Sequence, residues 1–165
     1  MNYGQIRKYD IANGPGIRTS IFVTGCSLNC KNCFNKEYQD PNFGEEWTDE
    51  TTKEIIDYLL KDEVAGLTIL GGEPFESAKD LTTIVIDIKN KIDKPIWIYS
   101  GYTFEKLIEN PTCKKLLEVV DVLVDGPFIE EKKDLKLKFR GSSNQRIIDV
   151  KESLANNSII LLNGY

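Results

Sequence analysis

Three of the four cysteines, Cys26, Cys30 and Cys33, lie within eight residues of one another. Their spacing, Cys-x3-Cys-x2-Cys, brings three thiols into one loop, and thiolates are ligands that soft metals and iron–sulfur clusters prefer. The chain contains no histidine, which excludes His-ligated zinc and general base catalysis by imidazole. Three thiolates on a cubane cluster leave one of its irons without a protein ligand. The spacing therefore predicts an iron–sulfur cluster with one iron open for chemistry.

Two other interpretations of the cysteines stay open. One is structural: a disulfide knot or a zinc-bound module, although a structural zinc site normally has four protein ligands. The other is a small iron–sulfur electron carrier, but carriers of the ferredoxin type use four cysteines for each cluster. The fourth cysteine, Cys113, is far from the loop in the sequence, and we expect it to be a buried structural residue. The colour and iron content of anaerobically purified protein separate iron from zinc.

The composition is that of a globular protein with one domain. The chain has 165 residues, of which 41% are apolar and 28% are charged, so we expect residues 1–165 to form a single domain with its own core. Its net charge of −5 argues against a general nucleic-acid binder, which needs a basic face. No apolar run is long enough for a membrane span, and the first residues do not form a secretory signal. We therefore predict a cytoplasmic protein that acts neither on nucleic acid nor at a membrane.

A second motif, Gly71-Gly72-Glu73-Pro74, follows directly after an apolar stretch at residues 66–70 that is typical of a buried strand. Two glycines let the backbone approach a ligand closely, and Pro74 fixes the direction in which the chain leaves. A carbonyl of this turn, with Glu73 beside it, can accept hydrogen bonds from an ammonium group. Alone, the motif also fits an ordinary turn between a strand and a helix. We expect a side chain at residue 72 to interfere with the ligand, either by crowding it or by excluding a positive φ.

Apolar patterning predicts strands and helices that alternate along most of the chain. Predicted strands span residues 17–24, 66–70, 95–99 and 119–124, and predicted helices span 48–61 and 77–92, with two shorter ones near 104–108 and after Pro111. This order implies a parallel sheet with right-handed crossovers and flanking helices. A closed eightfold barrel needs about 250 residues, so we expect an α/β fold of the open partial (β/α) barrel kind. Its uncovered side has room in principle for part of another protein.

The two ends of the chain depart from this alternation. Residues 3–12 are expected to form a short edge strand, and residues 35–47 a loop. Apolar and basic residues alternate at 135–140, which predicts a half-buried strand or an extended segment. Residues 147–150 are predicted to form a short strand, and residues 159–162 a further strand or an interface strip.

Together, the cysteine and glycine motifs resemble those of the radical S-adenosylmethionine enzymes. The resemblance implies an open partial barrel of that family's type and a 4Fe–4S cluster whose open iron is chelated by the amino and carboxylate groups of S-adenosyl-L-methionine. Reductive cleavage of this cofactor then releases a 5′-deoxyadenosyl radical, so no further catalytic side chain is expected. The metal ligands that it implies are Cys26, Cys30 and Cys33. The cofactor-binding residues that it implies in the second motif are Gly71, Gly72 and Glu73.

The cysteine loop departs from that family's usual motif at one position. An aromatic residue usually stands just before the third cysteine, whereas this chain has Asn32 there and Phe34 just after it. We expect the contact with adenine to come from backbone groups of Asn32, Cys33 and Phe34.

Further stretches resemble the proteins that activate anaerobic (class III) ribonucleoside-triphosphate reductase. They are residues 13–18, 71–75, 99–102, 124–128 and 140–146, and the resemblance covers about residues 10 to 150. It implies that the deoxyadenosyl radical takes hydrogen from a glycine Cα of the large reductase subunit, and that a low-potential donor such as flavodoxin supplies the electron. The alternative is activation of another glycyl-radical enzyme, because the chain does not reveal its partner's loop.

Four polar residues have two candidate roles each. Ser100 and Asp125 end successive predicted strands, so we expect them to face one cavity. In related activases such positions help to bind a monovalent cation beside the methionyl carboxylate, and capping of the next turn is the alternative. Arg18 and Arg146 are candidates for contacts with the cofactor's carboxylate or with acids of the partner; otherwise they are surface residues.

The segment 126–146 follows the last regular strand and is rich in basic residues. These are Lys132, Lys133, Lys136, Lys138, Arg140 and Arg146. On an otherwise acidic protein, this local excess can steer an acidic partner surface. A solvated loop is the alternative.

Overall fold

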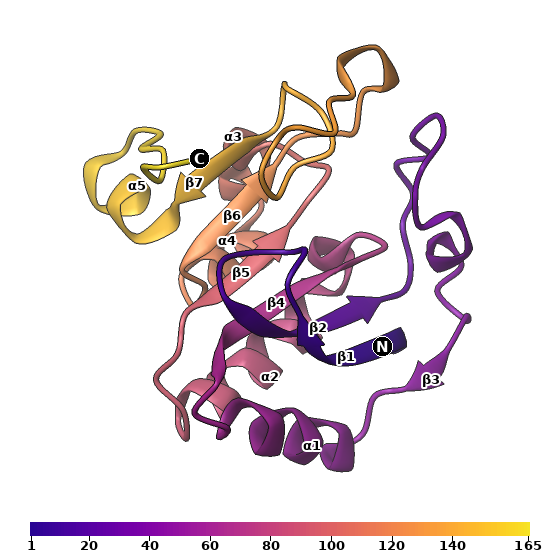
Figure 1. The fold of residues 1–165 in the computed structure, drawn as a ribbon, viewed down its shortest axis with the longest axis vertical. Helices are drawn as coiled ribbons and strands as arrows, with labels where there is room; N and C mark the ends of the chain where they lie inside the picture. Colours follow the sequence, from indigo (N-terminus) through magenta and orange to yellow (C-terminus); the bar gives the residue numbers. More distant parts are fainter.

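Seven strands form one sheet, in the order β3-β1-β2-β4-β5-β6-β7, in this computed structural model, which describes residues 1–165 (Figure 1). The strands are β1 (Asn2–Asp10), β2 (Ile17–Val23), β3 (Glu45–Glu46), β4 (Val64–Gly71), β5 (Ile96–Tyr99), β6 (Val122–Asp125) and β7 (Arg146–Asp149). The central strands β2, β4, β5 and β6 run parallel and pair in the order in which they occur in the chain. β1 and β7 run antiparallel to β2 and β6. The predicted α/β alternation and its parallel sheet are confirmed for the central strands.

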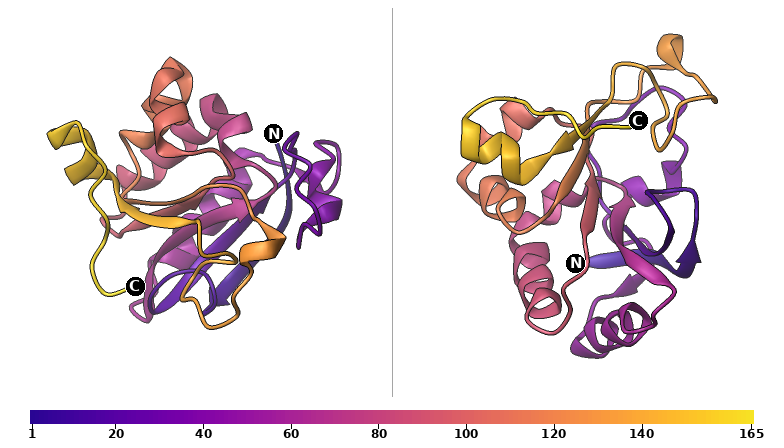
Figure 2. Two further views of the ribbon diagram at one scale, coloured as in Figure 1. Left: turned by 90° about the horizontal axis from the view of Figure 1, so that it is seen from above. Right: turned by 60° about the vertical axis from the view of Figure 1, so that its left-hand side comes forward.

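The helices pack on one face of this sheet (Figure 2). They are α1 (Asp49–Leu59), α2 (Ala78–Lys89), α3 (Phe104–Glu109), α4 (Pro111–Leu117) and α5 (Val150–Asn156). Short 3-10 turns span Lys36–Gln39, Pro74–Ser77 and Glu130–Lys132. In α1, the apolar residues Ile55, Ile56 and Leu59 recur at helical spacing and are buried against the sheet. None of the helices has the length and apolar character that a membrane span requires.

Side chains of the central strands alternate between the two faces of the sheet, as the two-residue period of a strand requires. On the helix face, Ile21, Ile98 and Leu123 join the helices in a core cluster of 24 buried residues. Their neighbours on the other face, such as Trp97 and Val124, belong to a separate small cluster. The helices therefore leave the second face of the sheet to loops from the strand ends.

Arg18 of β2 lies on this helix-free face and is almost completely buried, with 1% of its surface exposed. Its guanidinium donates to Thr68 Oγ1 at 2.9 Å and to the carbonyl oxygens of Leu67 at 3.0 Å and Pro95 at 2.9 Å. No carboxylate forms an ion pair with it. Burial lowers the pKa of Arg18 to about 10, so the group stays charged at neutral pH. Arg18 therefore ties β2 to β4 and to the chain entering β5, and the expectation that it contacts a cofactor, a partner or solvent is wrong.

The start of the chain also differs from expectation. β1 is not an edge strand, because the two-residue strand β3 pairs with its outer side. β3 and the 3-10 turn at Lys36–Gln39 lie in the stretch 35–47 that was expected to be a loop. A two-residue strand leaves no alternating pattern long enough to detect in a sequence.

Near the end of the chain, the strand predicted at 147–150 is confirmed as β7. Residues 135–140 form turns and bends instead of a strand. Helix α5 was not expected; it begins after Asp149, whose side chain accepts from Glu152 N, and it ends at Asn157 in the left-handed conformation. In the stretch 159–162, the only sheet contact is an isolated antiparallel β-bridge between Leu161 and Ile148 of β7. These elements are short, so tertiary contacts decide them more than local pattern does.

We expect Arg18→Met to destabilise the fold strongly. Methionine keeps an apolar stem of similar length but leaves several buried acceptors without a donor, and each such group costs about 1–3 kcal/mol. The free energy of unfolding in urea should fall by roughly 3 kcal/mol or more. Lys8→Met, at an exposed position of β1, is the control and should change it by less than about 0.5 kcal/mol. If both variants behave alike, the buried guanidinium does not hold the strands together.

Candidate metal centre and cofactor cavity

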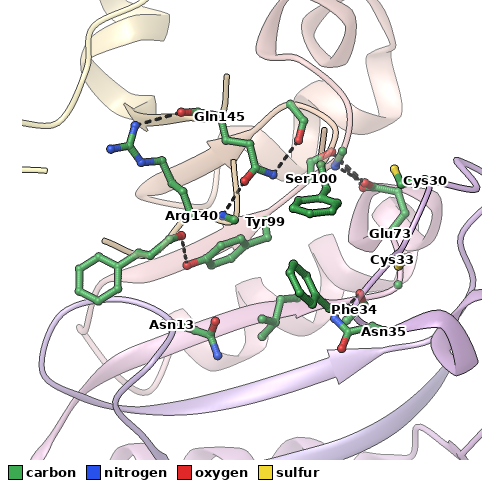
Figure 3. Close-up of a pocket in the computed structure, with 18 of the residues that line it drawn as sticks. Asn13, Cys30, Cys33, Phe34, Asn35, Glu73, Tyr99, Ser100, Arg140 and Gln145 are labelled. Atoms are coloured by element: carbon green, nitrogen blue, oxygen red, sulfur yellow. Dashed lines mark hydrogen bonds between the residues drawn. The ribbon is translucent and has the colours of Figure 1, made fainter. Parts of the chain in front are cut away.

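A cavity of about 510 Å³ lies on the helix-free face, at the carboxyl ends of the parallel strands (Figure 3). The strand ends contribute four segments to its wall: the cysteine loop (residues 24–35) after β2, the Gly71–Glu73 turn after β4, residues 99–101 at the end of β5, and parts of residues 126–145 between β6 and β7. Arg7 of β1 and residues 12–13 before β2 also line it. In open α/β sheets, ligands bind at this end of the strands. The cavity also has the size of a small-molecule or cofactor site.

All three cysteines of the cysteine loop are free of disulfides, are partly buried and line this cavity; they are Cys26, Cys30 and Cys33. Figure 3 shows Cys30 and Cys33 at the end of the cavity where Glu73 also lies. The loop turns sharply because Asn29 and Asn32 have positive φ of 50° and 56°. Asparagine tolerates this left-handed conformation better than bulky residues do. The backbone therefore gives a physical reason for asparagine, instead of an aromatic residue, before the third cysteine.

These thiols fit an iron–sulfur cluster better than a single metal ion. The cavity offers three cysteines, and the chain has no histidine, whereas a structural zinc site normally has four protein ligands. A cubane cluster makes a different demand, because each thiolate binds its own iron and the thiols need only surround a common space. Burial raises the pKa of the Cys26 thiol to about 11. The thiol is therefore protonated at neutral pH until a metal replaces the proton.

Hydrogen bonds hold the cysteine loop directly against the glycine turn. Gly72 N donates to Val23 O at 2.8 Å and Glu73 N donates to Gly25 O at 2.8 Å. On the other side of the loop, Asn35 Nδ2 donates to Gly71 O at 3.2 Å. The two motifs are far apart in the sequence but are adjacent here because β2 and β4 pair in parallel up to Val23 and Gly71. Both motifs thus form one structural unit.

Glu73 is a buried carboxylate in the wall of the cavity, with 1% of its surface exposed. It accepts hydrogen bonds from Phe75 N at 2.9 Å, Gly101 N at 2.7 Å and Ser100 Oγ at 3.0 Å. Burial raises the pKa of Glu73 to about 7, and these donors oppose the rise. Ser100 Oγ also lies 3.1 Å from the other carboxylate oxygen, so each oxygen of Glu73 has two hydrogen-bond contacts and the group is a buried negative charge beside the cavity. A cationic ligand there would favour the ionised form.

The glycines of the turn are required by the backbone around them. Gly71 has a φ of +114°, and a Cβ on it would lie 2.4 Å from Val23 O. A Cβ on Gly72 would lie 2.7 Å from the carbonyl oxygens of both Gly25 and Tyr38. The expectation for residue 72 therefore needs correction. Gly71, not Gly72, has the positive φ, and a side chain at 72 meets the backbone of the cysteine loop before it meets a ligand.

Ser100 and Asp125 end successive strands as expected, but only Ser100 lines the cavity. Asp125 follows Leu123 by two residues in β6, so both side chains point to the same face of the sheet, the face that the helices cover. Its carboxylate accepts from Arg146 Nη2 at 2.6 Å and from Phe104 N at 2.8 Å. The expectation that both residues face one cavity is wrong for Asp125, which binds the first residue of α3 and not the turn that follows β6. Ser100 does cap its following turn, because its Oγ accepts from Tyr102 N at 3.0 Å. Arg146 is held by its ion pair with Asp125 and does not line the cavity.

Three residues that support the site were not singled out from the sequence. Glu76 accepts from Ser27 N and Oγ and from Tyr102 OH, which fixes the start of the cysteine loop. Asn35 binds the glycine turn, and Tyr99 lines the cavity with its hydroxyl donating to Phe139 O at 2.7 Å. The alternation of β5 could have placed Tyr99 on the cavity face. No pattern in the sequence marks the other two.

Phe34 joins the cysteine loop to the segment 126–145. Its ring lies 4.9 Å from that of Phe128, and Lys133 Nζ lies 5.4 Å from its centre. Phe34 also lines the cavity, beside Cys33. The aromatic residue after the third cysteine thus connects the predicted cluster site to the far wall of the cavity. By contrast, Cys113 does not line the cavity, and its thiol lies 3.8 Å from Phe75 O.

Comparison with known proteins gives one family. Residues 12–148 match the family described as "4Fe-4S single cluster domain". Three relatives share the name anaerobic ribonucleoside-triphosphate reductase-activating protein. The relative from Vibrio cholerae is 39% identical to this chain over 152 residues. Those from enterobacteria phage T4 and Escherichia coli K12 are each 36% identical over 150 residues. The alignments cover 89%, 89% and 88% of this chain and 97%, 93% and 96% of the relatives.

We expect Gly72→Val to lose iron and not only to weaken ligand binding. The new side chain would displace the backbone at Gly25, immediately before Cys26. Iron per chain, measured after anaerobic reconstitution, should fall well below that of the wild type, while circular dichroism stays native-like. Gly164→Val adds the same side chain next to the end of the chain, where nothing lies within 4 Å and the backbone can relax its φ of +94° without moving the site, so it should keep its iron. Full iron loading with weak cofactor binding in Gly72→Val would instead place residue 72 against the ligand.

Proposed function

Because this chain belongs to the family of anaerobic ribonucleoside-triphosphate reductase-activating proteins, we propose that it activates such a reductase by forming a glycyl radical on it. A 4Fe–4S cluster on its three cysteines would pass one electron to S-adenosyl-L-methionine, breaking the C5′–S bond to give methionine and a 5′-deoxyadenosyl radical that takes a hydrogen atom from a glycine Cα. The electron comes from a low-potential donor such as flavodoxin. The products are 5′-deoxyadenosine and the glycyl radical of the reductase.

The observation that carries this proposal is the junction of two motifs in one cavity. Three free thiols and the Gly71–Glu73 turn line the same space of about 510 Å³ and are joined by backbone hydrogen bonds. A simple electron carrier needs only the thiols. The buried carboxylate and the glycine turn beside them supply what a ligand with an ammonium group requires. This combination supports a cofactor-cleaving enzyme over an electron carrier.

The residues of the cavity have distinct tasks in this proposal. The negative charge of Glu73 would attract the methionyl ammonium, and Ser100 and Gly101 N hold that carboxylate in place. Cys33 and Phe34 line the same cavity, and the backbone of Asn32, Cys33 and Phe34 would serve the adenine. Asp125 is engaged with Arg146, so a monovalent-cation site at Asp125 is not part of the proposal.

The fold suits a reaction on a second protein. We assign it to the open partial (β/α) barrel of the radical S-adenosylmethionine type. Its parallel strands β2, β4, β5 and β6 carry helices on one face and the cavity on the other. The reacting glycine must lie in contact with the radical before the cofactor is cleaved. A glycine on a loop of the reductase can meet this condition only by entering the cavity from its open side.

The proposal is tested by following both products. Anaerobically reconstituted protein is reduced and mixed with S-adenosyl-L-methionine and the large reductase subunit. Chromatography then measures 5′-deoxyadenosine, and electron paramagnetic resonance measures the glycyl radical. The wild type and Cys113→Ala should form both products, because Cys113 does not line the cavity. Cys26→Ala, Cys30→Ala and Cys33→Ala should bind less iron and form neither product.

Two results would contradict the proposal. A wild-type protein with a complete cluster that leaves the cofactor intact would remove the radical mechanism. Full activity in Cys30→Ala would remove the three-cysteine cluster. Formation of 5′-deoxyadenosine with a glycyl radical on a different glycyl-radical enzyme, and none on the reductase, would keep the chemistry and change the partner.

A further inference from the structure

Residues 132–140, which we call the basic lip, form part of the rim of the cavity. In Figure 1 they belong to the loop at the top of the molecule, between β6 and β7. The basic lip contains five basic side chains and one acidic one, a net charge of +4, whereas the rest of the chain carries −9 within the total of −5. The strongest concentration of positive charge in the sequence thus lies at the mouth of the predicted reaction site.

The basic lip has two chemically different sides. Leu135, Leu137 and Phe139 line the cavity, whereas the alternating residues Lys136 and Lys138 are exposed and do not line it. Leu135 is 88% exposed although it is at the cavity wall, so its apolar side chain stands at the opening. The alternation that predicted a strand here has a different result: the apolar side chains line the entrance and the two lysines between them face outward, whereas Arg140 lines the cavity.

The cations of the basic lip have no acidic partner within the chain. None of the five forms an ion pair, although the molecule has an excess of carboxylates. Unpaired charges of one sign at the mouth of a cavity attract a partner surface of the opposite sign and speed its association. Nucleic acid is the less favourable occupant, because a polyanion is repelled by the remaining charge of −9.

The basic lip is held in place before any partner arrives. Gln145 Oε1 accepts from Gly141 N at 2.9 Å and Ser142 N at 3.2 Å, and its Nε2 donates to Gly126 O at 3.0 Å. This closes the base of the loop. At the other side, Lys133 lies over the ring of Phe34 in the cysteine loop. A surface that is ordered in advance loses less conformational entropy on binding.

We propose that the basic lip is the docking surface for the reductase. An acidic surface of the reductase faces Lys136 and Lys138, and an apolar side chain near the reacting glycine packs against Leu135 and Leu137 as it enters the cavity. This proposal rests on the proposed function, because it takes the reductase as the partner. It adds the part of the chain that recognises the partner and the kind of surface that is recognised.

The test compares two double charge reversals with the same change in net charge. Lys136→Glu/Lys138→Glu alters the basic lip, and Lys79→Glu/Lys91→Glu alters exposed, unpaired lysines at α2 on the helix side. Equilibrium binding of the large reductase subunit and the initial rate of glycyl-radical formation are measured for both variants at low and high salt. Cleavage of S-adenosyl-L-methionine by dithionite-reduced protein without reductase reports on the cofactor site.

We expect the reductase concentration for half-maximal rate to rise about tenfold or more in the basic-lip variant at low salt. The difference should shrink at high salt, because exposed charges are then screened. The control variant should stay within about twofold of the wild type, and cofactor cleavage without reductase should be unchanged in both. Leu135→Asn should weaken binding at low and high salt alike, since it removes an apolar contact without changing the charge.

Equal binding and equal rates for the two double variants would overturn the proposal. So would binding of a DNA duplex that depends on Lys136 and Lys138 while reductase binding does not. If reductase binding depends on the basic lip but the wild type makes no glycyl radical, the docking surface stands and the proposed function fails. The two failures are therefore distinguishable.

Discussion

The site depends on two backbone hydrogen bonds, from Gly72 N to Val23 O and from Glu73 N to Gly25 O. They continue the parallel pairing of β2 and β4 past the ends of the strands, so the cysteine loop and the glycine turn move as one unit. Only a glycine fits at residue 72, because any Cβ would press on the carbonyl oxygens that hold the loop. The metal ligands and the cofactor turn are thus positioned by the sheet itself, and Arg18 fixes the same strands from the middle of the helix-free face.

The charge of the cavity is arranged in a complementary way. Glu73 is a buried carboxylate near the cysteines, and its three donors come from the backbone and from Ser100. The opposite rim is the basic lip, and Phe34 links it to the cysteine loop through Phe128 and Lys133. One end of the cavity therefore suits the cationic head of a small cofactor, and the outer rim suits an acidic protein. The proposed cofactor and the proposed protein substrate would therefore occupy separate parts of one cavity.

Sequence reasoning predicted the parts of this structure that follow from local pattern. The alternating central strands and helices, the three cysteines and the glycine turn lie where their patterns place them, since apolar periodicity and turn chemistry are local properties. Positions that depend on long-range packing were missed. In β6, the side chain of Asp125 points away from the cavity, toward Arg146. Arg18 is buried where it donates to Thr68 Oγ1, 50 residues away in β4, and to Pro95 O, 77 residues away. Likewise, nothing in the residues around 135–140 shows that they border a cavity and do not pair in the sheet.

The central claim is that the three-cysteine site leaves one iron open to the cofactor beside Glu73. Electron–nuclear double resonance of the reduced, cluster-loaded protein tests this directly, with S-adenosyl-L-methionine labelled with ¹⁷O in its carboxylate or ¹⁵N in its amino group. The account predicts hyperfine coupling from both labels to the cluster, with the coupling lost for cofactor analogues that lack the methionyl amino acid group. Bound cofactor with no coupling from either label would contradict it.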